Sequence, residues 1–260
     1  MKKIAATISA LLVSTAMASA ADMAAAPAYK AAPMAAPVAF YNWSGFYIGG
    51  HVGGGWGTEG STELAPGTVA FPTGTVFTSH DTSGFLGGVQ GGFNWQGQSP
   101  LVIGVEGEYS WADLSGTAST TSTVNGFVTT STARTRDIAM ATGRVGYAAN
   151  NWLFFAKGGW AWVQGTSSGT GVTGRGVFFD TTSSSTDRNG WIVGVGIEWG
   201  FAPNWSAKLE YNHADFGSTT VGVVSSLGTT NFVSSSERID IVKAGINYRF
   251  GWGGPVMAKY

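Results

Sequence analysis

Polar and apolar residues alternate along most of this chain, in blocks of about a dozen residues. Alternation of this kind is typical of a β-strand, whose successive side chains point to opposite faces. Each block is long enough to cross a bilayer, since a tilted transmembrane strand needs about 9–11 residues. Eight strands are therefore predicted, at approximately 43–57, 82–96, 101–113, 134–148, 152–164, 188–201, 205–216 and 236–250.

The gaps between these blocks are alternately long and short. The long gaps, which are rich in Ser, Thr and Gly, cover roughly 58–80, 114–133, 165–187 and 217–235. The short gaps are 97–100, 150–151 and 202–204. Outer-membrane barrels have short periplasmic turns and longer extracellular loops. The gap lengths therefore predict an eight-stranded antiparallel up-and-down transmembrane β-barrel with its termini in the periplasm and four loops outside.

The positions of the tryptophans distinguish a membrane barrel from a soluble β-sandwich, which also has alternating strands. Most of them fall at the ends of the blocks. Two aromatic belts at the lipid–water interfaces of a barrel would produce this distribution, whereas a sandwich would bury the rings in its core. The predicted belt residues are Trp43, Trp95, Trp152, Trp199 and Trp205 on the turn side, and Trp56, Trp111, Trp160, Trp162 and Trp191 on the loop side.

Composition supports the all-β assignment. Hydrophobic residues make up 43% of the chain and charged residues only 11%, yet after residue 20 no long uncharged apolar stretch suggests a transmembrane helix. The chain has 40 Gly, 15 Phe and 11 Trp, a composition that favours strands with glycine-rich bends. It contains no cysteine, which excludes disulfides, thiol catalysis and thiolate metal sites.

The N-terminal segment has the features of an export signal. Lys2 and Lys3 precede an apolar run over 4–17 and the small residues of 18–20, a pattern that predicts a signal peptide at 1–20. An uncleaved membrane anchor is the competing interpretation, but hydroxyl residues dilute the run. An Ala/Pro-rich periplasmic leader is expected at 21–42, followed by the barrel at 43–250 and a periplasmic C-terminal extension at 251–260.

Charge bears on the possible partners. Without Lys2 and Lys3, 12 of the 14 basic residues remain against 15 acidic ones, a net charge of −3. No basic cluster is available to neutralise phosphates, so a nucleic-acid partner is not expected.

Strand parity also selects the side chains that would face the barrel interior. The first block is ambiguous, because glycines blur its parity: Phe46, Ile48, Val52 and Trp56 could face lipid with Tyr47 and His51 inside. Gln90 and Asn94 are predicted to face inward, as are nine charged residues. The nine are Glu106, Glu108, Arg144, Lys157, Glu198, Lys208, Glu210, Lys243 and Arg249.

These five cations and four anions nearly balance. Eight strands enclose an interior just wide enough for side chains to fill, and buried charges persist when they are paired. We therefore expect an ion-pair network that plugs the lumen. The competing interpretation is a polar path that conducts small solutes or ions when the pairs rearrange.

Few residues suggest chemistry. Ser79-His80-Asp81 lies where the first long gap meets the second block, but adjacent strand residues point to opposite faces. A partner from another loop, such as Ser225 or Glu237, has no support, so no catalytic site is predicted. The three histidines, His51, His80 and His213, have no metal-ligand spacing. Neither a metal nor a cofactor is predicted. Haem ligation by His80 or His213 remains an alternative.

Several segments resemble the outer-membrane immunogenic protein family of alphaproteobacteria, porin-family surface antigens related to the OmpA-type barrel. The similarity extends over nearly all of 43–250. The segments are Trp43-Ser44-Gly45-Phe46-Tyr47-Ile48-Gly49, Gly87-Gly88-Val89-Gln90-Gly91-Gly92-Phe93-Asn94-Trp95-Gln96, Gly104-Val105-Glu106-Gly107-Glu108 with Trp111-Ala112, Arg144-Val145-Gly146-Tyr147, and Gly190-Trp191 onward to Glu210-Tyr211.

This resemblance implies a structural or surface-interaction role in a Gram-negative envelope, with a weak porin or a haem-binding surface protein as the alternatives. The implied partners are outer-membrane lipid and lipopolysaccharide, with the barrel-assembly machinery and periplasmic chaperones during biogenesis. A monomer is expected. Family members commonly end on the aromatic residue of the last strand, so Tyr248 and Phe250 are the predicted assembly signal. This chain departs from that pattern by continuing to Tyr260 through Pro255.

Overall fold

The computed structural model describes residues 41–64, 79–121, 128–172, 175–183, 186–225 and 230–250. The chain divides into two units, 1–38 and 39–260, and all of the described residues belong to the second. The predicted signal peptide, most of the predicted leader and the predicted extension at 251–260 lie outside the described residues. Within the described residues, no helix is long and apolar enough to span a membrane.

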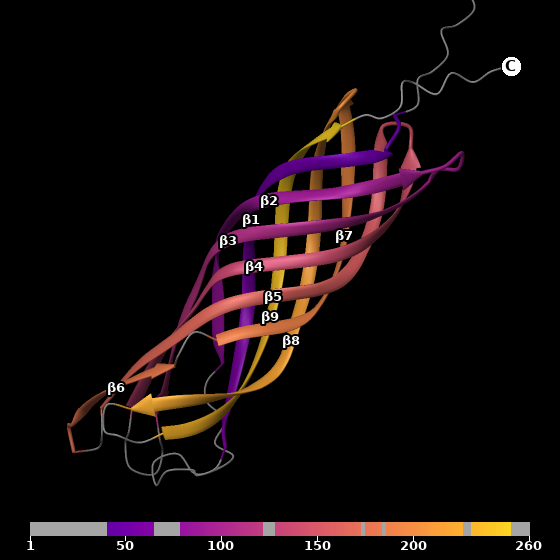
Figure 1. Ribbon diagram of the computed structural model, residues 1–260. Helices are drawn as coiled ribbons and strands as arrows, with labels where there is room; N and C mark the ends of the chain where they lie inside the picture. The colour runs from indigo at the N-terminus through magenta and orange to yellow at the C-terminus, as the bar shows by residue number, and fades with distance from the viewer. Residues whose placement is uncertain are drawn as a thin grey trace, which may run out of the picture. The chain divides into compact units, whose positions relative to one another are not determined.

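Eight long strands and one short strand make up the described residues (Figure 1). They are β1 (Gly45–Glu63), β2 (His80–Gln96), β3 (Leu101–Thr121), β4 (Val128–Ala149), β5 (Trp152–Val172), the short β6 (Phe178–Ser183), β7 (Thr186–Ala202), β8 (Trp205–Ser225) and β9 (Thr230–Phe250).

The long strands close into an antiparallel ring. Each pairs with the next along the chain, with β5 pairing directly to β7, and β9 pairs back to β1 over Phe46–Glu63. The predicted all-β fold with eight antiparallel barrel strands is confirmed. The parity of β1 is also settled, because Phe46, Ile48, Val52 and Trp56 are exposed while Tyr47 and His51 are buried.

The short turns join β2 to β3, β4 to β5 and β7 to β8 at one end of the barrel, here called the turn end. Asn150 adopts a left-handed conformation with φ 56°, which asparagine tolerates better than most residues. The opposite end, which carries the long connections, is called the loop end.

The strands continue well into the predicted loops, so the strand ends expected there are wrong. β3 runs to Thr121, β4 starts at Val128, β5 runs to Val172, and β6 lies inside the third predicted loop. These Ser- and Thr-rich stretches are polar, but β-branched threonine suits a strand. The hydroxyls also pair across the ladder, as between Ser119 and Thr130 at 2.9 Å.

Two glycines of the Gly87–Gly92 segment make room for side chains inside the barrel. A Cβ on Gly88 would lie 2.8 Å from His51 Nε2, and one on Gly92 would lie 2.5 Å from the Tyr47 hydroxyl oxygen. Both distances are too short for any larger residue. The glycines therefore permit β2 to approach the aromatic side chains that β1 directs inward.

Candidate functional site in the barrel interior

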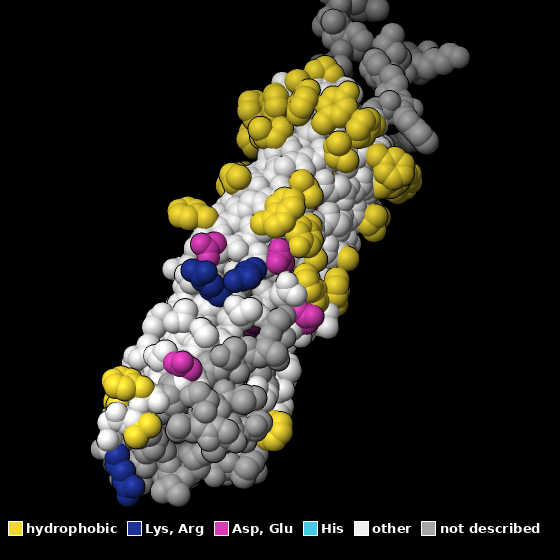
Figure 2. Space-filling model, turned by 60° about the vertical axis from the view of Figure 1, so that its left-hand side comes forward, with side chains coloured by type: hydrophobic (Ala, Val, Ile, Leu, Met, Phe, Trp, Pro, Cys, Tyr) yellow, Lys and Arg dark blue, Asp and Glu magenta, His cyan; other side chains and the backbone are white. Residues whose placement is uncertain are grey.

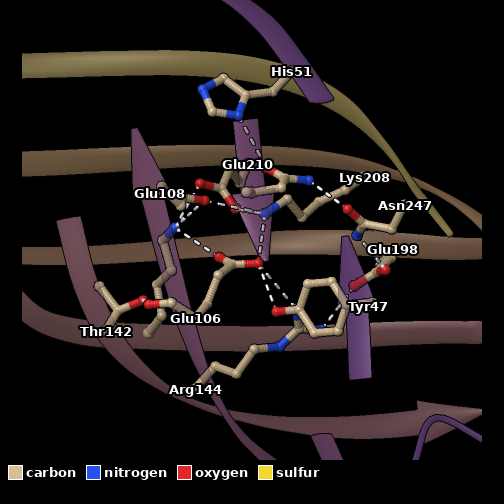
Figure 3. Close-up of polar contacts among 12 residues, drawn as sticks. Tyr47, His51, Glu106, Glu108, Thr142, Arg144, Glu198, Lys208, Glu210 and Asn247 are labelled. Atoms are coloured by element: carbon tan, nitrogen blue, oxygen red, sulfur yellow. Dashed lines mark hydrogen bonds and ion pairs between the residues drawn. The ribbon is translucent and has the colours of Figure 1, made fainter. Parts of the chain in front are cut away.

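Inward-facing charged residues gather at one depth of the barrel because the strand register aligns them. Arg144 of β4 pairs with Lys157 of β5, and Glu210 of β8 pairs with Lys243 of β9. Figure 3 shows most of these side chains converging from opposite walls. We call the following eight residues the ion-pair layer: Glu106, Glu108, Arg144, Lys157, Glu198, Lys208, Glu210 and Lys243.

Three lysines connect three glutamates in this layer. Lys157 Nζ lies 2.7 Å from Glu210 Oε1, 3.1 Å from Glu108 Oε1 and 3.2 Å from Glu106 Oε1. Lys208 Nζ lies 2.9 Å from Glu106 and 3.0 Å from Glu210. Lys243 pairs with Glu108 and lies 3.0 Å from Glu210. Every lysine therefore contacts at least two carboxylates.

Arg144 extends the layer toward the turn end. Its guanidinium lies 2.7 Å from Glu198 and 3.5 Å from Glu106, and its Cζ is 4.5 Å from the centre of the Phe155 ring. The Tyr47 hydroxyl donates to Glu106 at 2.7 Å and accepts from Arg144 at 3.2 Å. Tyr47 thus connects β1 to charges carried by β3 and β4 (Figure 3).

Neutral polar residues surround the charges. The His51 ring contacts Gln90 through Nδ1 at 3.1 Å and Ser110 through Nε2 at 2.8 Å. The Asn247 amide donates to Glu198 at 2.8 Å, and the Ser206 hydroxyl donates to the same carboxylate at 2.6 Å. The two bonds to Glu198 go to Oε1, the oxygen that Arg144 leaves open.

The layer is electrically neutral, with four carboxylates and four cations. Its ion-paired side chains are at most 4% exposed. Burying this many charges carries a large desolvation cost, which only dense pairing offsets. Breaking one pair would therefore leave an uncompensated charge away from water.

Three of these carboxylates lie close enough together to be considered as ligands of a metal ion. Oxygen atoms of Glu106, Glu108 and Glu210 lie within 4.8 Å of one another. Hard cations prefer oxygen ligands of this kind. Here three ammonium groups already lie among these oxygens, so the donor set is matched to lysine rather than to a divalent ion.

An apolar layer follows the ion-pair layer on its loop side. Toward the loop end of β9, the next inward residues beyond Lys243 are Ile241 and Ile239. In β3, Leu114 lies on the loop side of Ser110. The layer consists of Leu86, Leu114, Ile138, Met140, Ala161, Val163, Ile192, Ala214, Phe216, Ile239 and Ile241, each at most 5% exposed. This layer was not predicted from the sequence, although strand parity places Ile239 and Ile241 on the same inward face as Lys243.

A second apolar cluster lies at the turn end and corrects the assignment of Trp43. This residue was predicted in the aromatic belt, but it is 2% exposed and packs with Val102, Leu153 and Phe155. Its ring centre lies 4.5 Å from that of Tyr41. Trp43 has the same parity as Tyr47, which faces inward, so its direction continues the alternation of β1 and contradicts the belt assignment.

Arg249 is buried as predicted, yet it does not join the ion-pair layer. Its guanidinium donates to the Pro203 carbonyl oxygen at 2.8 Å and lies 4.3 Å from the centre of the Tyr41 ring. Among the described residues, no carboxylate lies within ion-pair distance of it. It sits at the turn end of β9, too far along the strand to reach the glutamates.

A small polar cavity of about 80 Å³ lies beyond the apolar layer at the loop end. Arg188 lies 3.2 Å from Glu59 and 3.6 Å from Glu237, and Ser235 donates to Glu59 at 2.6 Å. Burial raises the pKa of the Glu237 carboxyl, although the Arg188 charge opposes the shift. Arg188 was not predicted to face inward. It has the same parity in β7 as the inward residue Ile192, and this parity could have identified it.

The remaining predicted belt tryptophans lie on the outward face. Eight of them are 41–58% exposed, and Trp162 is half-buried beside them. Stacking links some of them along the wall, as between Trp152 and Trp199 at 5.9 Å. Figure 2 shows hydrophobic side chains covering the turn-end part of one face, with charged side chains only nearer the loop end.

Two of the three histidines lie on opposite sides of the barrel wall. His51 is inside the barrel, whereas His213 is on the outer face, where its Nδ1 lies 2.8 Å from Asp240. His80 pairs with Glu59 through the backbone of β1 and β2, and its side chain is not among those described. Tyr248 and Phe250, the predicted assembly signal, pack edge to face with ring centres 5.1 Å apart at the turn end of β9.

A closed antiparallel ring with an apolar, aromatic outer face and a charged, paired interior defines an integral membrane β-barrel. The comparisons with known proteins agree. A family model described as "Outer membrane protein beta-barrel domain" matches residues 8–250. The chain therefore belongs to the outer membrane protein β-barrel family.

Relatives of known name extend this result. The 31 kDa outer-membrane immunogenic protein of Brucella melitensis is 29% identical over 255 residues, covering 94% of this chain and 98% of the relative. The 22 kDa outer membrane protein of Rhizobium leguminosarum bv. viciae is 29% identical, covering 80% of this chain and 79% of the relative. These matches confirm the predicted resemblance and support an outer-membrane location.

Among solved structures, the outer membrane protease OmpT of Escherichia coli matches with a TM-score of 0.50 and 12% identity. The alignment covers 79% of this chain and 97% of the protease. At this level of identity the likeness concerns the fold alone.

Proposed function

We propose that this protein is a structural surface protein of the outer membrane whose barrel interior does not conduct, with its long loops outside and its termini in the periplasm. The observation that carries the proposal is the sequence of interior layers. Passing from the turn end, a solute would meet the Trp43 cluster, the neutral ion-pair layer and then the apolar layer.

The ion-pair layer and the apolar layer block permeation in different ways. An ion entering the ion-pair layer finds every cation engaged by at least one carboxylate. The apolar layer offers no polar group to replace the water that a solute would lose, a loss that costs several kcal/mol for an unpaired polar group. A steady current would require both layers to rearrange together.

A surface role is supported by the homologues rather than by a particular residue. The Brucella relative is named as an immunogenic outer-membrane protein. By analogy, the loop-end extensions of β3, β4 and β5 provide the surface of this protein that partners would meet. No catalytic role is proposed, because the adjacent residues Ser79, His80 and Asp81 point to alternate faces of an extended strand.

Single-channel recording in planar bilayers tests the closed interior. We expect no steady conductance steps from the wild-type protein. Steps that change in Glu106→Gln or Lys243→Met would show that current passes the ion-pair layer and would establish the weak-porin alternative. Arg238→Gln, on the outer wall, is the matched control and should leave any steps unchanged. Steps that none of the three variants alters would come from a contaminating channel.

Orientation can be tested separately because the chain has no cysteine. Single cysteines at Ser119 in β3, near the loop end, and at Asn204, in the last short turn, can be labelled with a membrane-impermeant maleimide on intact cells. Labelling of Ser119→Cys but not of Asn204→Cys is expected. The reverse result would contradict the proposed orientation.

A further inference from the structure

The charged side chains on the outer face of the barrel are distributed unevenly. Of the ten lysines and arginines in the described ranges, six point into the barrel and four point outward. All four outward cations are arginines, and all lie toward the loop end. They are Arg134, Arg136, Arg175 and Arg238.

Two of these arginines are placed side by side by an irregularity in β4. Ile138 and Met140 face inward, so strict alternation would direct both Arg136 and Arg134 into the barrel. A register shift between Thr135 and Asp137 reverses the parity. Thr135 is consequently buried at 4% exposure, while Arg134 and Arg136 are both exposed.

Bulges of this kind commonly re-aim side chains. Here the result is a pair of guanidiniums on the outer wall where the interior would otherwise have received two more cations. β3 has its own register shift at the same level, between Trp111 and Leu114. Both strands therefore depart from regular pairing at the point where the arginines emerge.

The depth of the pair matches a lipid headgroup region. Trp111, a belt residue that is 58% exposed, is the register partner of Asp137. Arg134 lies three residues beyond Asp137, or about 10 Å along the strand. With a strand tilt of about 35–45°, this is about 7–8 Å along the membrane normal, comparable to the polar region on each side of the hydrocarbon core.

The two guanidiniums are available to a ligand. Among the described residues, neither has a carboxylate oxygen within the 4.0 Å of an ion pair. Asp137, on the same face, accepts a hydrogen bond from the Tyr109 hydroxyl at 2.9 Å. Arg238, by contrast, pairs with Asp215 at 3.1 Å. Asp113 also lies on this face, so the pair is not part of a wholly basic surface.

We propose that Arg134 and Arg136 bind the phosphate groups of a phosphorylated lipid headgroup, that of lipopolysaccharide, at the loop-end interface. Arginine suits this ligand because its planar guanidinium donates two parallel hydrogen bonds to phosphate oxygens. Placement in the lipopolysaccharide leaflet rests on the proposed orientation of the barrel, whereas the affinity of the site does not.

The test measures binding of fluorescent rough lipopolysaccharide to the purified, folded protein in detergent, where either orientation gives the same access. Arg134→Gln with Arg136→Gln is expected to weaken binding at least about tenfold, since two charge-assisted contacts are lost. Arg134→Lys with Arg136→Lys should retain an intermediate affinity. Arg238→Gln is the matched control and should bind as the wild type does.

Four results would overturn the proposal. The double glutamine variant could bind as tightly as the wild type, or Arg238→Gln could lose as much affinity as that variant. Dephosphorylated lipopolysaccharide could also bind as well as the phosphorylated form, which would exclude phosphate recognition. Competition by inorganic phosphate at concentrations equal to those of lipopolysaccharide would likewise contradict a lipid ligand, because it would identify a site for free phosphate.

Folding of each variant is checked by its migration on gels with and without boiling. The cysteine-labelling experiment on intact cells tests orientation alone. Failure of the proposed orientation with retained lipopolysaccharide affinity would therefore be distinguished from failure of the arginine site.

Discussion

The ion-pair layer and the apolar layer fill the same barrel at neighbouring depths with opposite chemistry. The ion-pair layer holds eight charges that neutralise one another, so each residue depends on partners from other strands. The apolar layer depends on shape, because its members contribute contact area without specific partners. The difference implies that one layer responds to the loss of a charge and the other to the loss of volume.

The largest effect is expected from removing one charge of the ion-pair layer. Lys208→Met takes a cation away from Glu106 and Glu210 and leaves one excess negative charge, buried and uncompensated. A cost of about 3–5 kcal/mol in the free energy of unfolding is expected. Urea unfolding in lipid vesicles, followed by tryptophan fluorescence, measures it.

A second substitution tests whether charge balance is the cause. Lys208→Met combined with Glu106→Gln restores neutrality, so the double variant should lose less stability than the two single variants together. Strict additivity would show that the charges act independently. The surface variant Arg238→Gln should cost no more than about 1 kcal/mol, as expected for an exposed pair.

The apolar layer should respond to truncation with a smaller loss. Leu114 is fully buried, and Leu114→Ala is expected to cost about 3 kcal/mol through lost contacts and a residual cavity. The same unfolding measurement applies. Leu101→Ala, at a lipid-facing position that is 43% exposed, is the control, and an equal loss there would contradict a specific role for interior packing.

Tyr47 offers a finer comparison, because it connects β1 to the ion-pair layer through one hydroxyl. Tyr47→Phe removes the hydrogen bond to Glu106 and should cost about 2 kcal/mol, as for a bond to a charged group. Tyr211→Phe removes a bond of similar length to Asp240 on the outer face. A smaller loss is expected there because water can replace the hydroxyl.

The smallest effect concerns pH at the loop end. The pKa of Glu237 is raised by burial, so the folded protein holds this proton to higher pH than the unfolded chain does. Its contribution to stability therefore falls as pH rises from the ordinary glutamate pKa of about 4.3 to the raised value. Glu237→Gln should flatten the stability profile in this window, and an unchanged profile would mean that another group titrates there.

Alternation predicted the ring of strands and the inward direction of Glu106, Lys157 and Lys243, because each polar residue in those blocks is flanked by apolar ones. It failed where the backbone departs from regular alternation. Arg134 precedes the bulge between Thr135 and Asp137, so its direction could not be obtained by counting residues from Ile138 and Met140. Trp43 keeps the inward parity of Tyr47, and it was assigned to the belt from its place at the end of a block. The continuation of β3 over 114–121 and of β5 over 165–172 was not predicted. These stretches are rich in Ser and Thr, so polar and apolar residues do not alternate along them.

By itself, the sequence determined that the chain forms eight membrane-spanning strands with paired charges inside, since a period of two and the lengths of the connections are local properties. Tertiary structure decided which charges meet. Arg249 and Lys243 have the same parity in β9, yet only Lys243 reaches the glutamates. The register of the closed ring sets the depth of each side chain, and depth depends on all eight strands at once.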